Sequence, residues 1–200
     1  MGRDVTIVDS GGANIASLRF ALERLGARVE LTTDAGRLRA AERVILPGVG
    51  AAADAMERLR WRGLDDVIPA LEQPVLGICL GMQLLGRSSA EDDADCLGVL
   101  PLAAERLPAA AGHPVPNMGW LRLEGLVDHP LLHGLDDGSW FYFVHSYALP
   151  VDELCLARAR HAEQFCAVIA RDNFCATQFH PERSAADGAR LLRNFLELAA

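Results

Sequence analysis

Long apolar runs and clusters of positive charge are both missing from this sequence. No uninterrupted apolar stretch approaches the length that crosses a bilayer, and the first residues lack the basic start and apolar core of a signal peptide. The chain carries 19 Lys and Arg residues against 27 Asp and Glu residues, which gives a net charge of −8. An acidic chain without a basic patch is a poor candidate for binding nucleic acid. We therefore expect a cytoplasmic protein that binds neither nucleic acid nor a membrane.

Patterns typical of metal sites and of disulfide frameworks are missing as well. There is no Cys-x-x-Cys pair and no His-Glu-x-x-His motif, and Pro130 between His129 and His133 makes a shared helical face unfavourable. The cysteines are odd in number and scattered, at positions 79, 96, 155, 166 and 175. Such usage is typical of a reducing compartment. We expect free cysteines, no bound metal and no cofactor.

What the sequence does have is a regular alternation in its first half. Half of the 200 residues are apolar and 23% are charged, which suits one globular domain with a sizeable core. Short buried strands are expected at 5–9, 28–32, 43–46 and 74–78, with helices at 14–25 and 51–61. This alternation is typical of a parallel sheet that helices cover on both faces.

The second half is richer in strands. We expect strands at 117–123, 139–149, 166–171 and 174–179, as a partly antiparallel extension of the same sheet. Ser184 followed by Asp187 resembles a capping box at the start of a final helix, whose core-facing stripe runs from Gly188 to Leu196. The prediction is an α/β fold in three layers, with a central, mostly parallel sheet and a β-rich C-terminal extension, in a single domain over residues 1–200.

The stretch GICLG, residues 77–81, places a cysteine between two glycines where a strand should give way to a helix. A strand that turns sharply into a helix leaves one residue at the apex and needs small neighbours two residues away on either side. The start of a helix favours a thiolate, and the amide of Leu80 can point at a developing oxyanion. We predict that Cys79 is an exposed nucleophile. A small core residue is the alternative for Cys79, and it is our interpretation of the other four cysteines.

A nucleophilic cysteine needs a base, and the stretch QFHPE at 178–182 offers one. Residues two apart on an extended strand face the same way, so His180 and Glu182 project together, and Pro181 favours an extended His180. A carboxylate beside an imidazole fixes its tautomer and stabilises its charged form. We predict a triad of Cys79 as nucleophile, His180 as base and Glu182 as orienting group. Taken alone, His180 could equally be a structural histidine at a strand end.

A second glycine-rich stretch, LPGVG at 46–50, follows the third expected strand. Its glycines allow unusual backbone dihedrals, and a peptide unit flanked by glycines rotates at low steric cost. The amide of Gly48 or Val49 could therefore supply a second oxyanion donor, and rotation of that peptide could switch the donor on and off. The alternative is a plain turn between a strand and a helix.

Together, LPGVG, GICLGMQLLG and QFHPERS resemble the oxyanion strand, the nucleophile elbow and the His-x-Glu pair of the class I, or triad, glutamine amidotransferases. The resemblance covers essentially the whole chain. The segments DSGGANIASL, PNMGW and FYFVHSYALP are most similar to one branch of this family, the glutaminase subunits that feed a cyclase in histidine biosynthesis. The resemblance implies the class I amidotransferase fold. It also implies a heterodimer with a (β/α)₈-barrel cyclase subunit, to which the chain would pass ammonia.

The resemblance also assigns residues. It implies that Cys79 attacks the side-chain amide of glutamine to form a thioester, with the amides of Val49 and Leu80 holding the oxyanion. Implied substrate-binding residues are Gly48, Gln83, His145, Ser146 and Tyr147, and implied partner contacts are Asn14, Trp120 and Arg183. Asn117 and Leu121 depart from the family, which usually has a histidine and an asparagine there, and both are expected at the partner face.

Three alternatives remain open at this stage. The chain could be the amidotransferase subunit of another pathway, such as anthranilate or aminodeoxychorismate synthesis. It could be a catalytically silent binding module that keeps the fold, although all three triad residues are present. It could also be a cysteine hydrolase of the same broad fold, which would need neither Gln83 nor the LPGVG stretch.

Overall fold

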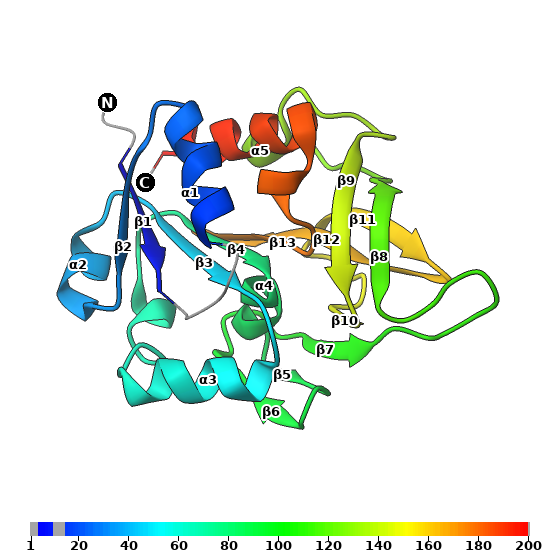
Figure 1. Cartoon of the computed structure of the whole chain (residues 1–200), viewed down its shortest axis with the longest axis horizontal. Helices are drawn as coiled ribbons and strands as arrows, with labels where there is room; N and C mark the ends of the chain where they lie inside the picture. Colours follow the sequence, from blue (N-terminus) through cyan, green and yellow to red (C-terminus); the bar gives the residue numbers. More distant parts are fainter. Residues whose placement is uncertain (1–3, 10–14, 200) are drawn as a thin grey trace.

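The computed structural model describes residues 4–9 and 15–199 and places a seven-stranded sheet between two layers of helices (Figure 1). The strand order is β11-β12-β13-β4-β3-β1-β2. Strands β13, β4, β3, β1 and β2 run parallel to one another, and β12 and β11 continue the sheet antiparallel. The predicted α/β fold with a mostly parallel sheet is confirmed.

The bounds of the elements are as follows. The central strands are β1 (Asp4–Val8), β2 (Arg28–Thr32), β3 (Val44–Gly48), β4 (Val75–Cys79), β11 (Cys155–His161), β12 (Glu163–Arg171) and β13 (Phe174–Thr177). The helices are α1 (Ile15–Arg24), α2 (Ala35–Ala40), α3 (Ala52–Trp61), α4 (Leu80–Leu85) and α5 (Ala185–Glu197), with short 3-10 turns η1 (Ile68–Ala70), η2 (Pro130–Leu132) and η3 (Pro181–Arg183). The small strands are β5 (Ser88–Ser89), β6 (Ala94–Asp95), β7 (Ala103–Arg106), β8 (Asn117–Arg122), β9 (Trp140–His145) and β10 (Tyr147–Ala148).

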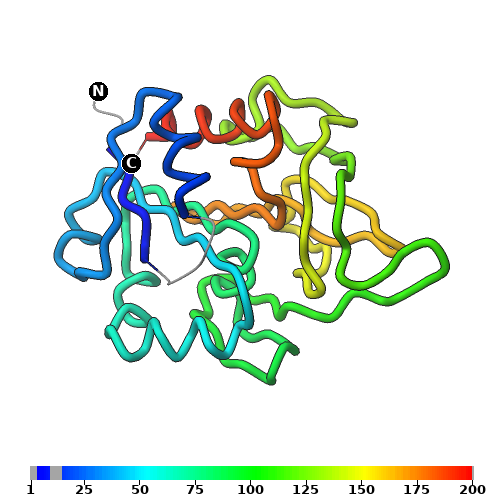
Figure 2. The backbone as a smooth tube through the Cα atoms, in the orientation of Figure 1, coloured from blue at the N-terminus to red at the C-terminus, as the bar shows by residue number. Residues whose placement is uncertain are grey.

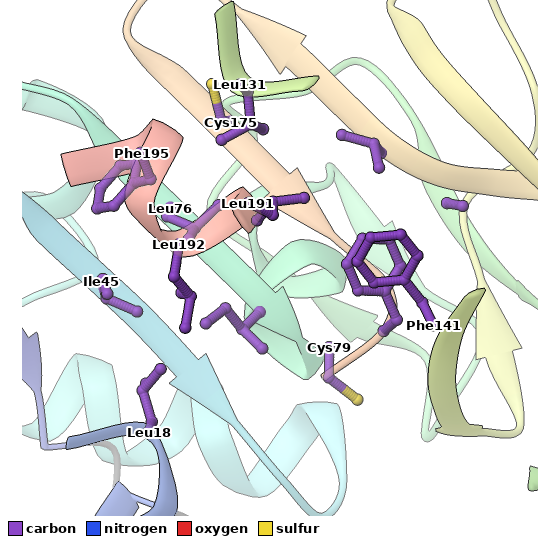
Figure 3. Packing of buried hydrophobic residues seen from close by; sticks show 14 of the residues in the cluster. Leu18, Ile45, Leu76, Cys79, Leu131, Phe141, Cys175, Leu191, Leu192 and Phe195 are labelled. Carbon is purple, nitrogen blue, oxygen red and sulfur yellow. The ribbon is translucent and has the colours of Figure 1, made fainter. Parts of the chain in front are cut away.

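Two apolar clusters fill the space on the two faces of the sheet. Successive residues of a strand point to opposite faces, so Ile45 of β3 packs in one cluster and Leu46 in the other. The first cluster takes residues of α1 and α5, including Leu18, Leu191 and Phe195 (Figure 3). The second takes residues of α2, α3 and α4. Among the described residues, no helix is both long and apolar enough to span a bilayer.

The sequence led us to expect that all strands of the second half extend the central sheet, and this prediction is wrong for some of them. β8 and β9 form a separate two-stranded ribbon, and β10 joins a four-stranded sheet with β7, β5 and β6. The ribbon is buried on one side, where Phe141 of β9 stacks on Phe179 with ring centroids 4.0 Å apart. The ribbon therefore packs over the central sheet as a further layer instead of adding an edge strand to it.

The predicted capping box at the start of α5 is wrong. The hydroxyl of Ser184 makes no capping bond, and instead donates to the carbonyl of His180 at 2.7 Å and accepts from the amide of Tyr142 at 3.0 Å. The carboxylate of Asp187 accepts from the amide of Trp140 at 3.1 Å. Both side chains thus fasten the start of α5 to β9.

The topology brings distant segments of the chain to one edge of the sheet. β4 lies between β3 and β13, with Gly48 paired to Cys79 and Thr177 paired to Ile78. The backbone trace shows these segments, which are far apart in the sequence, running side by side (Figure 2). The carboxyl ends of parallel strands meet at the same edge, where crevices for ligands form. The stretches that follow β3, β4 and β13 therefore converge, which places the segment of Cys79 beside that of His180.

Candidate active site

Cys79 lies at a strained turn between β4 and α4. Its backbone has φ 55 and ψ −111, a conformation that non-glycine residues rarely adopt. A Cβ atom added to Gly81 would lie 1.9 Å from the carbonyl oxygen of Leu46, and one added to Gly77 would lie 2.9 Å from the carbonyl oxygen of Gly81. The two glycines are therefore sterically required, and the predicted sharp turn is confirmed.

The prediction that Cys79 is exposed at this turn is wrong. The residue is only 6% exposed, because β9 passes over it and the thiol donates to the carbonyl of Val144 across 3.7 Å. Val144 is far away in the sequence, so the covering strand could not be foreseen from the turn itself. Cys79 nevertheless lines the cavity described below.

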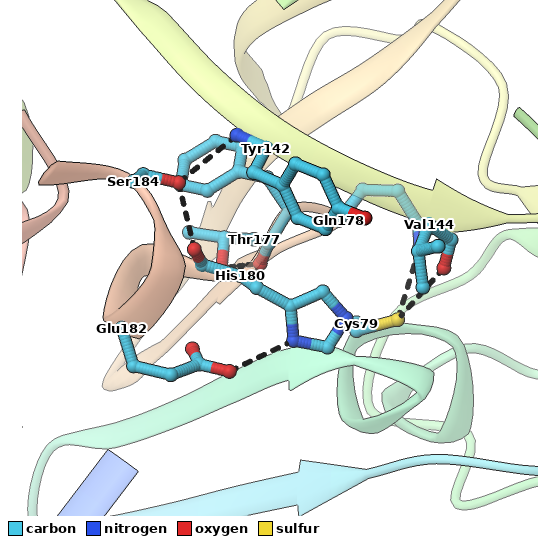
Figure 4. A network of polar contacts seen from close by, with 9 residues as sticks. Cys79, Tyr142, Val144, Thr177, Gln178, His180, Glu182 and Ser184 are labelled. Carbon is cyan, nitrogen blue, oxygen red and sulfur yellow. Dashed lines mark hydrogen bonds and ion pairs between the residues drawn. The ribbon is translucent and has the colours of Figure 1, made fainter. Parts of the chain in front are cut away.

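His180 and Glu182 form the pair that their spacing predicts. Nδ1 of His180 lies 3.0 Å from Oε1 of Glu182, and both side chains are almost fully buried. Because a carboxylate only accepts, Nδ1 must donate. The imidazole lies between Glu182 and Cys79 (Figure 4), and its Nε2 is buried without a hydrogen-bond partner in the described part of the chain. The second nitrogen is thus available on the side of the thiol.

The charge state of His180 follows from these neighbours. Burial by itself lowers the pKa of His180, but the contacts with Cys79 and Glu182 outweigh burial and raise the pKa to about 10. His180 is therefore held as an imidazolium at neutral pH. A protonated imidazole at the cavity can give a proton to a group bound there.

The backbone of His180 is also fastened on both sides. Its amide donates to the carbonyl of Tyr142 at 3.0 Å, and its carbonyl accepts from the hydroxyl of Ser184 (Figure 4). The same hydroxyl accepts from the amide of Tyr142. β9 thereby fixes the position of the imidazole relative to Cys79.

A cavity of about 300 Å³ opens beside the thiol. Its lining residues are Val49, Gly50, Cys79, Leu80, Gln83, Glu91, Pro116, Met118, Val144, His145, Ser146, Tyr147 and His180. The structure thus gathers most of the predicted site residues around one cavity, with Gly48 beside it in β3 and Glu182 behind His180. A larger hollow of about 610 Å³, between η2 and α5, contains none of the predicted residues.

Two residues at this site carry no prediction from the sequence. Glu91 lines the cavity, and its Oε2 accepts from the amide of Ala52 at the start of α3. Burial raises the pKa of Glu91, and the bond from Ala52 opposes that rise. Gln178 is fully buried, and its Nε2 lies 3.9 Å from the sulfur of Cys79. Glu91 is one of several acidic residues in the EDDAD stretch, and nothing in the sequence distinguishes it from them. Gln178 could have been identified, because it belongs to the same QFHPE stretch as His180 and Glu182.

Gln83 is held in one orientation. Its Nε2 donates to the carbonyl of Tyr147 at 2.8 Å and to Oε1 of Gln178 at 3.2 Å. An amide nitrogen has two hydrogens, so both are used and Oε1 is the polar atom left for a ligand. The carbonyl of Ser146 accepts from the amide of Leu107. The carbonyl of Tyr147 already accepts from Gln83 and lies 2.9 Å from Nδ1 of His145, so the backbone contact predicted at Tyr147 is left to its amide.

The predicted oxyanion donors lie next to the thiol. Leu80 is the first residue of α4, so its amide has no acceptor within the helix. Gly48 is so close to α4 that a Cβ atom there would lie 2.9 Å from Cβ of Leu80. Gly50 has φ +95, which glycine adopts readily. The roles of Gly48, Val49 and Leu80 remain predictions.

Trp120 and Arg183, the predicted partner contacts, meet on one surface. Both are exposed, and both contact the ring of Tyr142, at 6.0 Å between ring centroids for Trp120 and 5.2 Å for the guanidinium of Arg183. Asn14 lies outside the described residues. Asn117 differs from expectation, because it is buried behind the cavity instead of facing a partner.

Comparison with known proteins now defines the class. A family model described as glutamine amidotransferase class-I matches residues 6–199, and the chain belongs to this family. Similar relatives are named imidazole glycerol phosphate synthase subunit HisH. The protein of Xanthomonas campestris pv. campestris (strain 8004) is 51% identical over 196 residues, 98% of each chain. That of Xylella fastidiosa (strain Temecula1) is 50% identical over 197 residues, again 98% of each chain. The family resemblance inferred from the sequence is confirmed.

Solved structures show the same fold. A structure titled "Crystal structure of glutamine amidotransferase" has a TM-score of 0.75 at 23% identity, and covers 96% of this chain and 97% of that chain. The structure titled "Structure of PurLQS from Thermotoga maritima" has a TM-score of 0.71 at 19% identity, with 98% of each chain covered. At these identities the likeness establishes the fold alone, and it agrees with the predicted fold class.

Proposed function

We propose that the chain is the glutaminase subunit of an imidazole glycerol phosphate synthase. It hydrolyses glutamine to glutamate and ammonia. A cyclase subunit then uses the ammonia to make imidazole glycerol phosphate and an aminoimidazole carboxamide ribotide in histidine biosynthesis. The observation that carries the reaction is the buried Cys79, His180 and Glu182 array at one cavity. Identity of about half over nearly the full length of the relatives named HisH supports the pathway.

The chemistry proceeds in two halves. The thiolate of Cys79 attacks the side-chain amide carbon of glutamine, and the amides of Leu80 and Val49 bind the oxyanion that forms. His180 gives the proton on Nε2 to the leaving nitrogen, so that ammonia departs and a glutamyl thioester remains. Neutral His180 then takes a proton from water, which attacks the thioester and releases glutamate. Glu182 keeps Nδ1 protonated throughout.

The cavity also suits the polar end of glutamine. Glu91 contributes a carboxylate to the lining, and a carboxylate is the natural partner of an α-ammonium group. The fixed Oε1 of Gln83 is an acceptor that likewise favours a donor group on the substrate. Glutamine would therefore lie with its ammonium toward these acceptors and its side-chain amide toward Cys79.

Partner binding would use the surface formed by Trp120, Tyr142 and Arg183, and Asn14 stays a predicted contact outside the described residues. We propose a heterodimer with a (β/α)₈-barrel cyclase, in the cytoplasm, with the whole chain acting as one domain. A pull-down with the cyclase tests this, using Trp120→Ala as the disrupting variant. Trp61→Ala is the matched control, because Trp61 is a still more exposed tryptophan at the far end of α3. Equal capture of both variants would remove Trp120 from the interface.

Activity would depend on the partner through the oxyanion segment. Losing one oxyanion donor costs about 10²–10³ in rate, so rotation of the Val49 peptide is a large enough switch. Glutamate release is measured for the chain alone, for the complex, and for the complex with ribotide. We expect the rate to rise in that order. An isolated chain that already runs at the rate of the ribotide-bound complex would exclude the switch and leave the triad intact.

The same assay tests the function itself. Glutamate release by the complex, abolished in Cys79→Ala, is the expected result. A chain that captures the cyclase but never releases glutamate would be a silent binding module. A chain that binds a chorismate-using enzyme instead of the cyclase would belong to another pathway of the same family.

A further inference from the structure

We infer that Asn117 and His145 form a buried positioning pair, in which Asn117 sets the tautomer of His145 and that tautomer holds Gln83 with its carbonyl oxygen toward glutamine. The inference rests on the proposed glutaminase function for its kinetic consequences. Its structural content, the tautomer and the amide orientation, stands on the contacts described below.

The pair is formed across the β8–β9 ribbon. Asn117 is the first residue of β8 and His145 the last of β9, and the two are direct cross-strand partners. Nδ2 of Asn117 lies 3.0 Å from Nε2 of His145, and both residues are buried. On its other side, Nδ1 of His145 lies 2.9 Å from the carbonyl oxygen of Tyr147. Both ring nitrogens are therefore occupied by the protein, and neither is free to bind substrate.

The partners determine where the proton sits. A carbonyl oxygen only accepts, so Nδ1 of His145 must carry the hydrogen. The amide nitrogen of Asn117 only donates, so Nε2 must be bare. The opposite orientation of the Asn117 amide would require a doubly protonated ring. That state is unfavourable here, because burial lowers the pKa of His145 to about 4, a shift that the bond to Tyr147 opposes.

The surroundings of the ring reinforce the neutral state. The rings of Phe165 and Phe143 lie 4.9 and 5.8 Å from the imidazole, centroid to centroid. The titratable groups that act on it are His161 and His180, and both oppose a positive charge on His145. A neutral ring with one donor and one acceptor is thus the form that this environment selects.

The tautomer matters because the carbonyl of Tyr147 is shared. It accepts from Nδ1 of His145 at 2.9 Å and from Nε2 of Gln83 at 2.8 Å, which uses both of its lone pairs. The second hydrogen of the Gln83 amide goes to Gln178. If Gln83 turned over, its own oxygen would face two acceptors. With Tyr147 held in place by His145, Gln83 keeps Oε1 toward the cavity, where a substrate must supply a donor.

The first measurement reads the tautomer directly. In ¹⁵N-labelled chain, long-range ¹H–¹⁵N spectra identify the ring signals of His145 by their loss in His145→Asn. We expect a protonated Nδ1 and a bare Nε2 at pH 7. Asn117→Leu removes the donor to Nε2, and we expect the hydrogen to move to Nε2 in part or completely. A wild-type ring with its hydrogen on Nε2, or a tautomer unchanged in Asn117→Leu, would overturn the inference.

Asn117→Asp keeps the inference testable if Asn117→Leu fails to fold. Asn117→Asp places an acceptor against Nε2, so we expect a doubly protonated ring that still donates from Nδ1 to Tyr147. Asn117→Asp should therefore disturb glutamine binding less than Asn117→Leu does. A larger rise of KM in Asn117→Asp than in Asn117→Leu would contradict the assigned direction of the bonds.

Kinetics of the cyclase complex give the functional readout. We expect Asn117→Leu to raise KM for glutamine about tenfold, the size of one lost hydrogen bond, while kcat changes far less because Cys79 and His180 are untouched. His145→Asn keeps a donor near the position of Nδ1, so it should recover most of the KM lost in His145→Leu. Equal KM values in these two His145 variants would refute the role of Nδ1. A wild-type complex without glutaminase activity would refute the proposed function, and the NMR result would still decide the tautomer.

Discussion

His145 and His180 line one cavity and are buried to nearly the same degree. At neutral pH the ring of His145 is nevertheless neutral, and that of His180 is protonated. Burial favours the neutral ring in both cases. For His180, Cys79 and Glu182 outweigh burial and raise the pKa to about 10, whereas His145 faces a carbonyl and an amide, and its pKa falls to about 4. Neighbours that can carry charge make the difference, so His180 suits the proton transfer that we propose for it, and His145 suits a fixed hydrogen-bond pattern.

The largest expected effect comes from removing the nucleophile. Cys79→Ala should lower glutamate release by more than about 10³-fold, because no other thiol lies in the cavity lining. It also removes one of the two groups that raise the pKa of His180, so that pKa should fall. Glutamate release by the complex and an NMR titration of His180 measure the two effects.

Cys175→Ala is the matched control for this experiment. Cys175 is buried in β13 and does not line the cavity, and the substitution should cost only about 1–2 kcal/mol of stability. Loss of activity in Cys175→Ala, or full activity in Cys79→Ala, would contradict the assignment of the nucleophile.

Substitutions at His180 and at Glu182 should lower kcat by different amounts. His180→Ala removes the group that carries the proton and should cost about 10³-fold in kcat. Glu182→Gln keeps an oxygen that accepts from Nδ1 and should cost less, about 10–10². Both rate constants are measured side by side in the complex. An equal or reversed order would show that the roles of base and orienting group are assigned wrongly.

The acid limb of the stability profile should depend on His145. The ordinary histidine pKa is 6.5 and the folded pKa of His145 is about 4, so the unfolded chain binds a proton first as pH falls. The folded state therefore loses stability from about pH 6.5 down to 4, by up to about 3 kcal/mol. Urea unfolding at several pH values should show a shallower loss in His145→Asn. His180 has the opposite sign, and its contribution is lost as pH rises toward 10.

The smallest expected effect concerns the anchor of His180. Ser184→Ala breaks the bonds to the carbonyl of His180 and the amide of Tyr142, and should cost about 1–2 kcal/mol of stability with a several-fold loss of kcat. Thr177→Val is a useful control, because the hydroxyl of Thr177 donates to the nearby carbonyl of Phe179 and makes no bond to β9. A loss of kcat in Thr177→Val as large as in Ser184→Ala would mean that the hydroxyl of Ser184 has no special role.

The contrast between these histidines also shows what a sequence reveals. The turn at Cys79 and the pairing of His180 with Glu182 depend on residues two positions apart, so spacing alone predicted them. The cover over Cys79 depends on Val144, and the position of Asn117 depends on register across the β8–β9 ribbon. Those contacts join residues 65 and 28 positions apart, which local patterns cannot encode.

Smaller elements follow the same rule. α2 was not predicted, although Asp34 accepts from the amide of Arg37 as an ordinary helix N-cap does. Here the local signal was present and the helix was too short to show a periodic stripe. Glu91 was missed for the opposite reason, since only the fold brings its loop to the start of α3.

The close approach of Gly81 to Leu46 has a consequence for evolution. The gap that forbids a side chain at Gly81 lies between the elbow and β3, the strand that leads into the LPGVG stretch. A substitution at Gly81 would push that strand away and so damage two parts of the site at once. In a randomised library selected for ammonia supply, position 81 should return as glycine alone. The turn at Cys79 and the end of β3 can therefore change only together.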